Sequence, residues 1–150
     1  MSMTLESRAS VNVQFAEPVP EISDSDVAEW VESARGDRLG EICVRFMGLE
    51  EARLLNRQFR KVDKPTNVLA FQSDCQEILG DLAICLPLAL QEAQEQGKSL
   101  SSHLAHLVIH GTLHLCGLDH QTEPEAQRME SLESDLMHRL GFPNPYQDYG

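Results

Sequence analysis

The segment HGTLHLCGLDH, residues 110–120, restricts what this chain can fold into more than any other segment. Residues four apart on an α-helix lie on the same face, so a helix through His110 and His114 points two imidazoles at one ion. Gly117 can end that helix in a left-handed turn, after which the chain can fold back and bring His120 to the same ion. The spacing H-x3-H-x5-H therefore predicts one zinc ion (Zn2+) held by three histidines. Three protein ligands leave one position for water or substrate, which is typical of catalytic sites.

The residue after the first histidine limits the chemistry of this site. Zinc peptidases with the sequence H-E-x-x-H keep their general base at that position, whereas this chain has Gly111. The spacing H-x3-H-x2-G-x2-H is nevertheless that of a class of zinc peptidases, so a zincin-like metalloendopeptidase is one alternative. A general base contributes about 10²–10⁴-fold to the rate, so a peptidase that lacks one is expected to be a poor catalyst.

Size and composition indicate one globular domain over residues 1–150. The 150 residues are 41% hydrophobic, which is enough for a packed core. The N-terminal segment does not resemble a signal peptide, and the longest apolar segment, residues 82–90, is too short to cross a bilayer. The four cysteines form no C-x-x-C pair, which indicates reduced thiols. We therefore expect a cytoplasmic protein that does not bind membranes, and in the absence of a recognisable dimer surface we expect a monomer.

The chain is acidic overall, but half of its basic residues lie in one segment. A net charge of −12 argues against a general nucleic-acid binder, because contacts with phosphates need cations. However, six of the twelve Lys and Arg residues fall within residues 45–64. A local basic surface on an acidic protein fits a specific anionic substrate. The alternative, which the composition supports equally, is a solvated helix face on which these cations pair with glutamates.

The periodicity of apolar residues predicts an α+β fold, with one mixed sheet of about four strands packed against about five helices. Strands are predicted at residues 11–16, 41–46, 67–71 and 78–85, the last two as a hairpin or near-hairpin. Helices are predicted from an N-cap within 23–26 to Gly36, over 49–60, from Pro87 to Gly97, from Ser99 or Ser101 through the histidines, and from Thr122 to Gly141.

Two of these helices bear on function. The helix that carries the H-x3-H motif is apolar on most sides, which predicts a buried, central helix. In helix 49–60 we expect Leu54, Leu55 and Phe59 to form the buried stripe and the arginines to point outward.

Four further residues lie close to the histidine motif. His106 lies one turn before His110, and both it and His103 can line a cleft above the metal. For each, a satisfied polar residue near the helix start is the alternative. Cys116 lies about 200° round the helix from His114, so it is expected to pack in the core. Asp119 is either a carboxylate that hydrogen-bonds a ligand histidine or a turn residue.

Three separate segments resemble one family. They are RKVDKPTNVLAF (residues 60–71), LGDLAI (residues 79–84) and H-x3-HGTLHLCGLDH (residues 106–120), and together they are similar to the bacterial YbeY family of rRNA maturation factors. The chain departs from that family at Asn67, Ala70 and Leu118, where Asp, Ser and Tyr are frequent; these positions bear on substrate contacts and not on the metal ligands.

The resemblance implies a function and roles for particular residues. It implies a zinc-dependent, single-strand-specific endoribonuclease acting in small-subunit rRNA 3′-end maturation, ribosome biogenesis and ribosome quality control. Its implied partners are single-stranded RNA and the small ribosomal subunit with its proteins. It also implies zinc at His110, His114 and His120 and a functional arginine at Arg60.

The expected mechanism assigns the cations to the substrate. Arg60 is expected to be catalytic, holding the scissile phosphate through its planar fork and stabilising the charge that develops there. Arg57, Lys61, Lys64 and His106 are expected to contact the RNA strand. Without the family resemblance, Arg60 would be interpreted as a surface cation at a helix end. The absence of a glutamate base leaves open whether water or a 2′-hydroxyl attacks. A further alternative is a non-catalytic ribosome-assembly factor whose zinc stabilises a binding surface.

Overall fold

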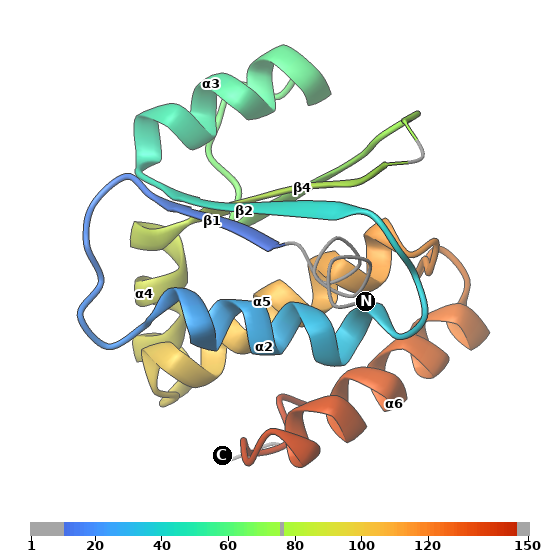
Figure 1. Cartoon of the computed structure of the whole chain (residues 1–150). Helices are drawn as coiled ribbons and strands as arrows, with labels where there is room; N and C mark the ends of the chain where they lie inside the picture. The colour runs from blue at the N-terminus through green and yellow to red at the C-terminus, as the bar shows by residue number, and fades with distance from the viewer. Residues whose placement is uncertain (1–10, 76, 147–150) are drawn as a thin grey trace.

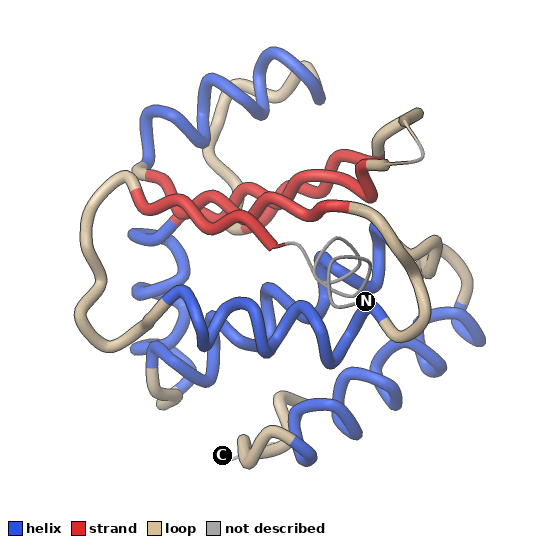
Figure 2. Tube along the Cα trace, in the orientation of Figure 1, coloured by secondary structure: helices blue, strands red, loops and turns tan. Residues whose placement is uncertain are grey.

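The computed structural model describes residues 11–75 and 77–146 and confirms the predicted α+β fold. A single mixed sheet separates one helix from four others (Figures 1 and 2). No helix in these ranges is both long and apolar enough to cross a membrane. The elements in chain order are β1 (Val11–Phe15), α2 (Asp24–Arg35), β2 (Glu41–Met47), α3 (Leu49–Arg60), β3 (Val68–Gln72), β4 (Ile78–Cys85), α4 (Leu86–Gln96), α5 (Leu100–Leu115) and α6 (Glu123–Arg139).

The sheet has the strand order β1-β2-β4-β3. β1 pairs with β2 and β2 with β4 in parallel, whereas β3 pairs with β4 in antiparallel, as the predicted near-hairpin requires. In the β3–β4 ladder Ala70 lies opposite Leu82 and Phe71 opposite Asp81. This order makes β3 an edge strand. Because side chains alternate between the two faces of a strand, Ala70 and Phe71 point to opposite sides of the sheet.

The main core lies between the sheet and the helices α2, α5 and α6, below the sheet in Figure 1. Ile42, Val44 and Phe46 of β2 are fully buried in it, together with Val27 and Val31 of α2. The capping signals read from the sequence are present: Ser23 and Thr122 each form a capping box at the start of their helices. The apolar faces that the sequence predicts for β2 and α2 are the faces that meet this core.

The other face of the sheet is covered by α3 alone, and here one prediction was wrong. Leu54 and Phe59 are 45% and 55% exposed, and only Leu55 of the predicted stripe is partly buried; the fully buried residues of α3 are Ala52 and Asn56. Ala52 packs in a small second core with Met47, Leu69, Ala83 and Cys85. The small side chain of Ala52 is buried where α3 meets the sheet. Several large apolar side chains of the helix stay exposed to solvent, because α3 covers only part of this face.

Candidate metal centre

The helix α5 begins and ends where its capping residues place it. The Ser99 side chain accepts a hydrogen bond from the backbone N–H of Ser102 at 3.0 Å. At the other end Gly117 has a φ of +99°, its N–H donates to the carbonyl of His114, and the N–H of Leu118 donates to the carbonyl of Leu113. These two hydrogen bonds form a Schellman motif, which turns the chain back along the helix. The predicted role of Gly117 is confirmed.

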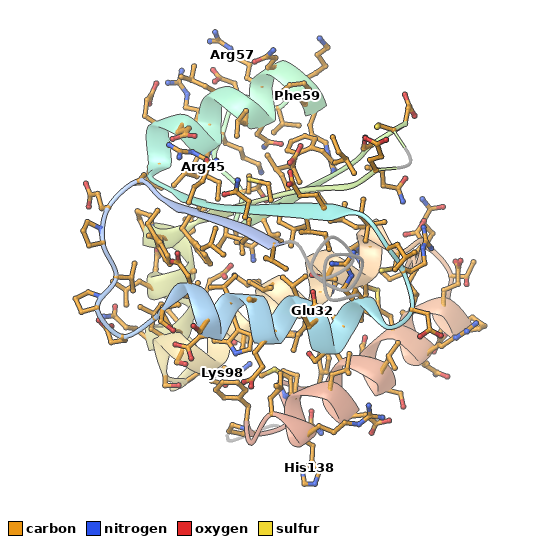
Figure 3. All side chains as sticks on the ribbon, in the orientation of Figure 1. Glu32, Arg45, Arg57, Phe59, Lys98 and His138 are labelled. Carbon is orange, nitrogen blue, oxygen red and sulfur yellow. The ribbon has the colours of Figure 1, made fainter. Side chains whose placement is uncertain are left out.

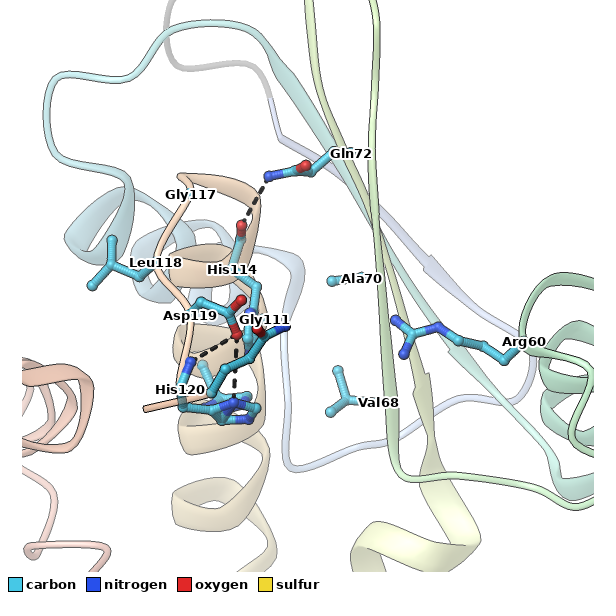
Figure 4. A pocket seen from close by; sticks show the side chains of 12 residues that line it. Arg60, Val68, Ala70, Gln72, Gly111, His114, Gly117, Leu118, Asp119 and His120 are labelled. Carbon is cyan, nitrogen blue, oxygen red and sulfur yellow. Dashed lines mark hydrogen bonds and ion pairs between the residues drawn. The ribbon is translucent and has the colours of Figure 1, made fainter. Parts of the chain in front are cut away.

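This turn brings three imidazoles together. The ring centroids of His110 and His114 are 4.7 Å apart, those of His114 and His120 are 4.9 Å apart, and those of His110 and His120 are 5.5 Å apart. One ligand nitrogen from each ring lies within 4.8 Å of the other two. The three rings therefore surround one point that can hold a metal ion, as the spacing predicted; Figure 4 shows His114 and His120 of this group.

The first of these rings is held by a buried carboxylate that the sequence analysis did not identify. Glu133 of α6 has a fully buried side chain, and its Oε2 lies 2.7 Å from His110 Nδ1. Its other oxygen, Oε1, lies 2.6 Å from His106 Nε2 and also accepts a hydrogen bond from the hydroxyl of Tyr146. A buried carboxylate with three donors around it orients the rings that it contacts.

The electrostatics of this cluster fix the proton on His110. Burial opposes the charge of Glu133, but the hydrogen bonds from His106, His110 and Tyr146 outweigh it and lower the pKa of Glu133 to about 2. The carboxylate is thus ionised and only accepts, so His110 donates from Nδ1. Its Nε2 then carries the lone pair that a metal needs.

The protonation state of His114 also suits a zinc ligand. Burial and the neighbouring rings of His110 and His120 lower the pKa of His114, against an opposing effect of Asp119. The neutral imidazole, which is the form that binds metal, is thus favoured. Three imidazole nitrogens converging on one point, one of them on a ring oriented by a carboxylate, are the arrangement that zinc ligands adopt in proteins. The residues present therefore fit a zinc ion.

The three histidines line a cavity of about 670 Å³, and Arg60 lies on its opposite side. The arginine comes from the end of α3, on the other face of the sheet, and reaches past β3 toward the histidines (Figure 4). Val68 and Ala70 of β3 lie between them in the wall of the cavity. An anion held by this guanidinium would thus lie in the same cavity as the three imidazoles, which is the placement expected of a catalytic arginine.

The end of α3 is fixed by local backbone contacts. Lys61 adopts a left-handed conformation, with a φ of 60°, and its N–H donates to the carbonyl of Arg57. The buried amide of Asn56 donates to the carbonyl of Lys64 at 2.8 Å and so ties the following loop to the helix. These contacts set the direction in which Arg60 leaves the helix.

The six cations of residues 45–64 fall into two groups, and of the six only Arg60 lines the cavity. Arg45 pairs with Glu51, and Arg53 pairs with Glu50 and Asp63. In contrast, within residues 11–75 and 77–146 no carboxylate pairs with the remaining four, which are Arg57, Arg60, Lys61 and Lys64. Arg57 points outward from α3 (Figure 3). Part of the cluster is thus a solvated helix face with paired cations, and part is a basic surface without partners. The four unpaired cations lie at the C-terminal end of α3 and in the loop that follows it, next to the cavity.

Three of the other residues near the motif, His103, His106 and Cys116, lie outside the cavity, whereas Asp119 lines it. His106 is turned toward Glu133 and Tyr146 and does not line the cavity with Arg60. His103 is buried, its Nε2 lies 2.8 Å from Oε1 of Glu92 of α4, and its Nδ1 has no hydrogen-bond partner among the described residues, so it is a core residue outside the cavity. Cys116 packs against the main core as expected.

Asp119 acts as a turn residue. Its Oδ1 accepts from the backbone N–H of His120 at 2.7 Å, while the distance from the same oxygen to the His120 ring is 3.7 Å, too long for a hydrogen bond. Gly111 also has a structural role, because a Cβ there would lie 2.7 Å from Leu82 Cδ2 in the core. A side chain at this position would have to displace the sheet side chain on which α5 packs.

The three departures from the family pattern have different surroundings. Ala70 and Leu118 line the cavity, and both are apolar where a hydroxyl is frequent in the family. Asn67 does not line it; its amide lies 3.1 Å from both oxygens of Glu92. Ala70 and Leu118 thus form part of the cavity wall, whereas Asn67 belongs to a polar contact with α4.

Comparison with known proteins places this chain in one family. A sequence model described as Endoribonuclease YbeY matches residues 10–141, which contain both the histidine triad and Arg60. The chain belongs to the YbeY family. Among its YbeY relatives, the Endoribonuclease YbeY of Paraburkholderia phytofirmans is 43% identical over 97% of this chain and its own full length. That of Stutzerimonas stutzeri is 47% identical over 83% of this chain and 82% of its own length.

A solved structure supports the fold. The solution structure of a protein from Thermotoga maritima superposes with a TM-score of 0.59, covering 93% of this YbeY chain and 98% of that one. The two sequences are 23% identical, so this likeness concerns the architecture alone.

Proposed function

We propose that this YbeY-family protein is a zinc-dependent endoribonuclease that cleaves single-stranded RNA. The observation that carries the proposal is that one cavity joins three convergent imidazoles to an unpaired arginine. The relatives' description as endoribonucleases supports RNA as the substrate. A cavity with a metal site on one wall and a guanidinium on the other suits a phosphodiester, because both can neutralise its charge.

The residues of the chain divide the work of the reaction. His110, His114 and His120 would hold the zinc ion, which when bound lowers the pKa of water toward about 7 and polarises a phosphoryl oxygen. Arg60 binds the scissile phosphate and stabilises the charge that develops on it in the transition state. Glu133 keeps the proton of His110 on Nδ1.

No side chain at position 111 serves as a general base. The Gly111 backbone borders the cavity, and Leu82 fills the space behind it. The nucleophile is therefore either water or the 2′-hydroxyl of the RNA itself. Cleavage of an RNA that carries a single 2′-deoxy nucleotide at the cleaved position distinguishes them: attack by water tolerates this change, and attack by the 2′-hydroxyl does not.

We place this activity in small-subunit rRNA 3′-end maturation, ribosome biogenesis and ribosome quality control. Membership of the YbeY family supports this setting. The partners would be rRNA and the small ribosomal subunit with its associated proteins, and the compartment would be the cytoplasm. We further propose that residues 1–150 form one domain that acts as a monomer.

Two substitutions test the proposal on zinc-loaded protein with single-stranded RNA. His114→Ala should lose both zinc and cleavage, because it removes a ligand. Arg60→Glu should keep zinc and lower cleavage by about 10²–10³-fold, the effect typical of removing one transition-state donor. Arg139→Glu, an exposed charge reversal on α6, is the matched control and should cleave normally.

Two results would contradict the proposal. If cleavage of casein exceeds cleavage of RNA, the metalloendopeptidase alternative holds. If His114→Ala stays folded and still supports rRNA maturation in cells, the protein acts as a zinc-stabilised assembly factor and catalysis is not its function.

A further inference from the structure

A second cavity, of about 390 Å³, lies on the opposite face of the sheet from the histidines. It is formed between α3 and the strands, and its walls include Leu55, Phe59 and Phe71, with Gln14 and Asp81 among its polar groups. Its volume falls in the range of about 300–1,000 Å³ that is usual for sites that bind small organic groups. The proposed cleavage chemistry does not use this cavity.

An exposed aromatic ring lies at this cavity. Phe59 is 55% exposed, and its ring centroid lies 5.1 Å from that of Phe71 with an interplanar angle of 61°. Phe71 thus supports Phe59 edge-on and leaves ring surface of Phe59 to solvent. Aromatic rings exposed in this way are the stacking surfaces that single-strand-binding proteins offer to bases.

Sequence neighbours in α3 and in β3 line the two cavities. Phe59 lines the second cavity and the next residue, Arg60, lines the histidine cavity. The same relation holds in β3, where Ala70 lines the histidine cavity and Phe71 the second one. The edge strand β3 and the end of α3 thus contribute to the walls of both cavities, so an RNA strand bound at Arg60 that continued across this edge would reach the second cavity.

The charges around the second cavity favour a base and disfavour a phosphate inside it. Asp81 makes no ion pair with any residue in the described ranges, and Arg45 is already paired with Glu51 at 2.6 Å. The unpaired cations, Arg57, Lys61 and Lys64, lie outside it, around the end of α3. A strand with its phosphates on these cations can direct a base, which is uncharged, toward the aromatic wall.

We propose that this second cavity is a base-binding subsite, in which one unpaired base of the RNA, flanking the cleaved phosphate, stacks on Phe59 beside Phe71. The inference rests on the proposed endoribonuclease function and adds a specific determinant to it. It explains a preference for single strands, because a base within a duplex is stacked on its neighbours and cannot enter the subsite.

The test compares cleavage of a short single-stranded RNA with cleavage of a set in which each base near the cleaved bond is removed in turn. All proteins are zinc-loaded, and kcat/KM is measured. For the wild type, an abasic nucleotide at one flanking position should lower kcat/KM by roughly 5- to 150-fold, the range for loss of one base–aromatic stack. Phe59→Ala should show the same loss on intact RNA and no further loss at that abasic position.

Two variants control for effects unrelated to stacking. Phe59→Tyr retains the ring and should keep both the rate and the sensitivity to the abasic position. Leu54→Ala removes a comparably exposed apolar side chain of α3 that does not line the cavity, and it should cleave like the wild type. If Phe59→Ala does not fold, the abasic series with the wild type and Phe59→Tyr decides the question.

Failure of this inference differs from failure of the proposed function. If the wild type cleaves RNA but shows no sensitive flanking position, or if Phe59→Ala cleaves as well as Leu54→Ala, the subsite is refuted. If zinc-loaded wild type cleaves no single-stranded RNA at all, the proposed function fails and this inference fails with it.

Discussion

The helices α5 and α3 both contribute to the histidine cavity, but they are built in opposite ways. α5 is mostly buried, and three of its four histidine rings contact a carboxylate: His103 contacts Glu92, and His106 and His110 contact Glu133. α3 lies on the sheet by small side chains and exposes both apolar residues and unpaired cations. One helix is fixed from several sides, and the other is largely open to solvent.

This difference matches the two tasks of the site. A metal site needs ligands held within narrow limits of distance and angle, and buried partners hold them there. A surface that receives a flexible RNA strand needs cations that are not already paired, because a salt bridge within the protein competes with the phosphate. We infer that α5 supplies the chemistry and α3 supplies the binding.

The largest expected effect is at the contact that keeps α5 fixed. Glu133→Gln removes the charge that accepts from His106, His110 and Tyr146, so the orientation of the His110 ring is no longer enforced. Losing such a partner of a ligand costs about 10–100-fold in metal affinity. Competition for zinc with a chromophoric chelator measures it. Asp135→Asn, an exposed acid on the same helix, should retain the affinity; equal affinities for the two variants would show that α5 needs no such partner.

A smaller effect is expected on α3, where paired and unpaired cations can be compared directly. Arg57→Ala should weaken RNA binding a few-fold and reduce the slope of log K against log salt concentration by about 0.7, the value for one phosphate contact with a single strand. Arg53 is engaged by Glu50 and Asp63, so Arg53→Ala should change this slope little. Salt titrations of RNA binding by both variants test the comparison, and identical slopes would remove the distinction between the two groups.

The smallest effect concerns the pH dependence of stability at the start of α5. Burial lowers the pKa of His103 below its ordinary value of 6.5, against the opposing carboxylate of Glu92. The unfolded chain therefore takes up a proton at His103 before the folded protein does. The resulting stabilisation of the fold is complete above pH 6.5 and decreases as the pH falls below that value.

Urea unfolding of the metal-free protein between pH 7 and pH 5 measures the contribution of His103 to the unfolding free energy. His103→Gln should show a flatter dependence of the unfolding free energy on pH than the wild type, while His138→Gln, at an exposed position, should follow the wild type. A steeper profile for His103→Gln would mean that the folded state favours the charged ring and that this end of α5 is less buried than the structure indicates.

The sequence predicted those parts of the molecule that depend on local spacing. The convergence of His110, His114 and His120 followed from the helical period and from one glycine, since a Schellman turn needs only a few consecutive residues. The order of strands and helices followed in the same way from alternation and capping residues. Such features need no knowledge of which element packs on which.

The errors concern contacts between elements that are distant in the chain. The apolar stripe of α3 was assigned to the core because periodicity shows that a helix has an apolar face and not how much of that face is covered. Glu133 was missed because it lies 23 residues beyond His110. A signal was present, however: Glu133 lies four residues after Met129 and four before Met137, on the buried stripe of α6, where an isolated acid needs a partner.

The central claim is that three imidazoles of this chain hold one metal ion, and X-ray absorption at the zinc edge of the zinc-loaded protein tests it most directly. We predict one zinc per chain with a shell of three histidine nitrogens at about 2.0–2.1 Å and a further light atom, and loss of that signal in His114→Ala. A sulfur shell at about 2.3 Å, or a zinc signal that survives His114→Ala unchanged, would contradict the account.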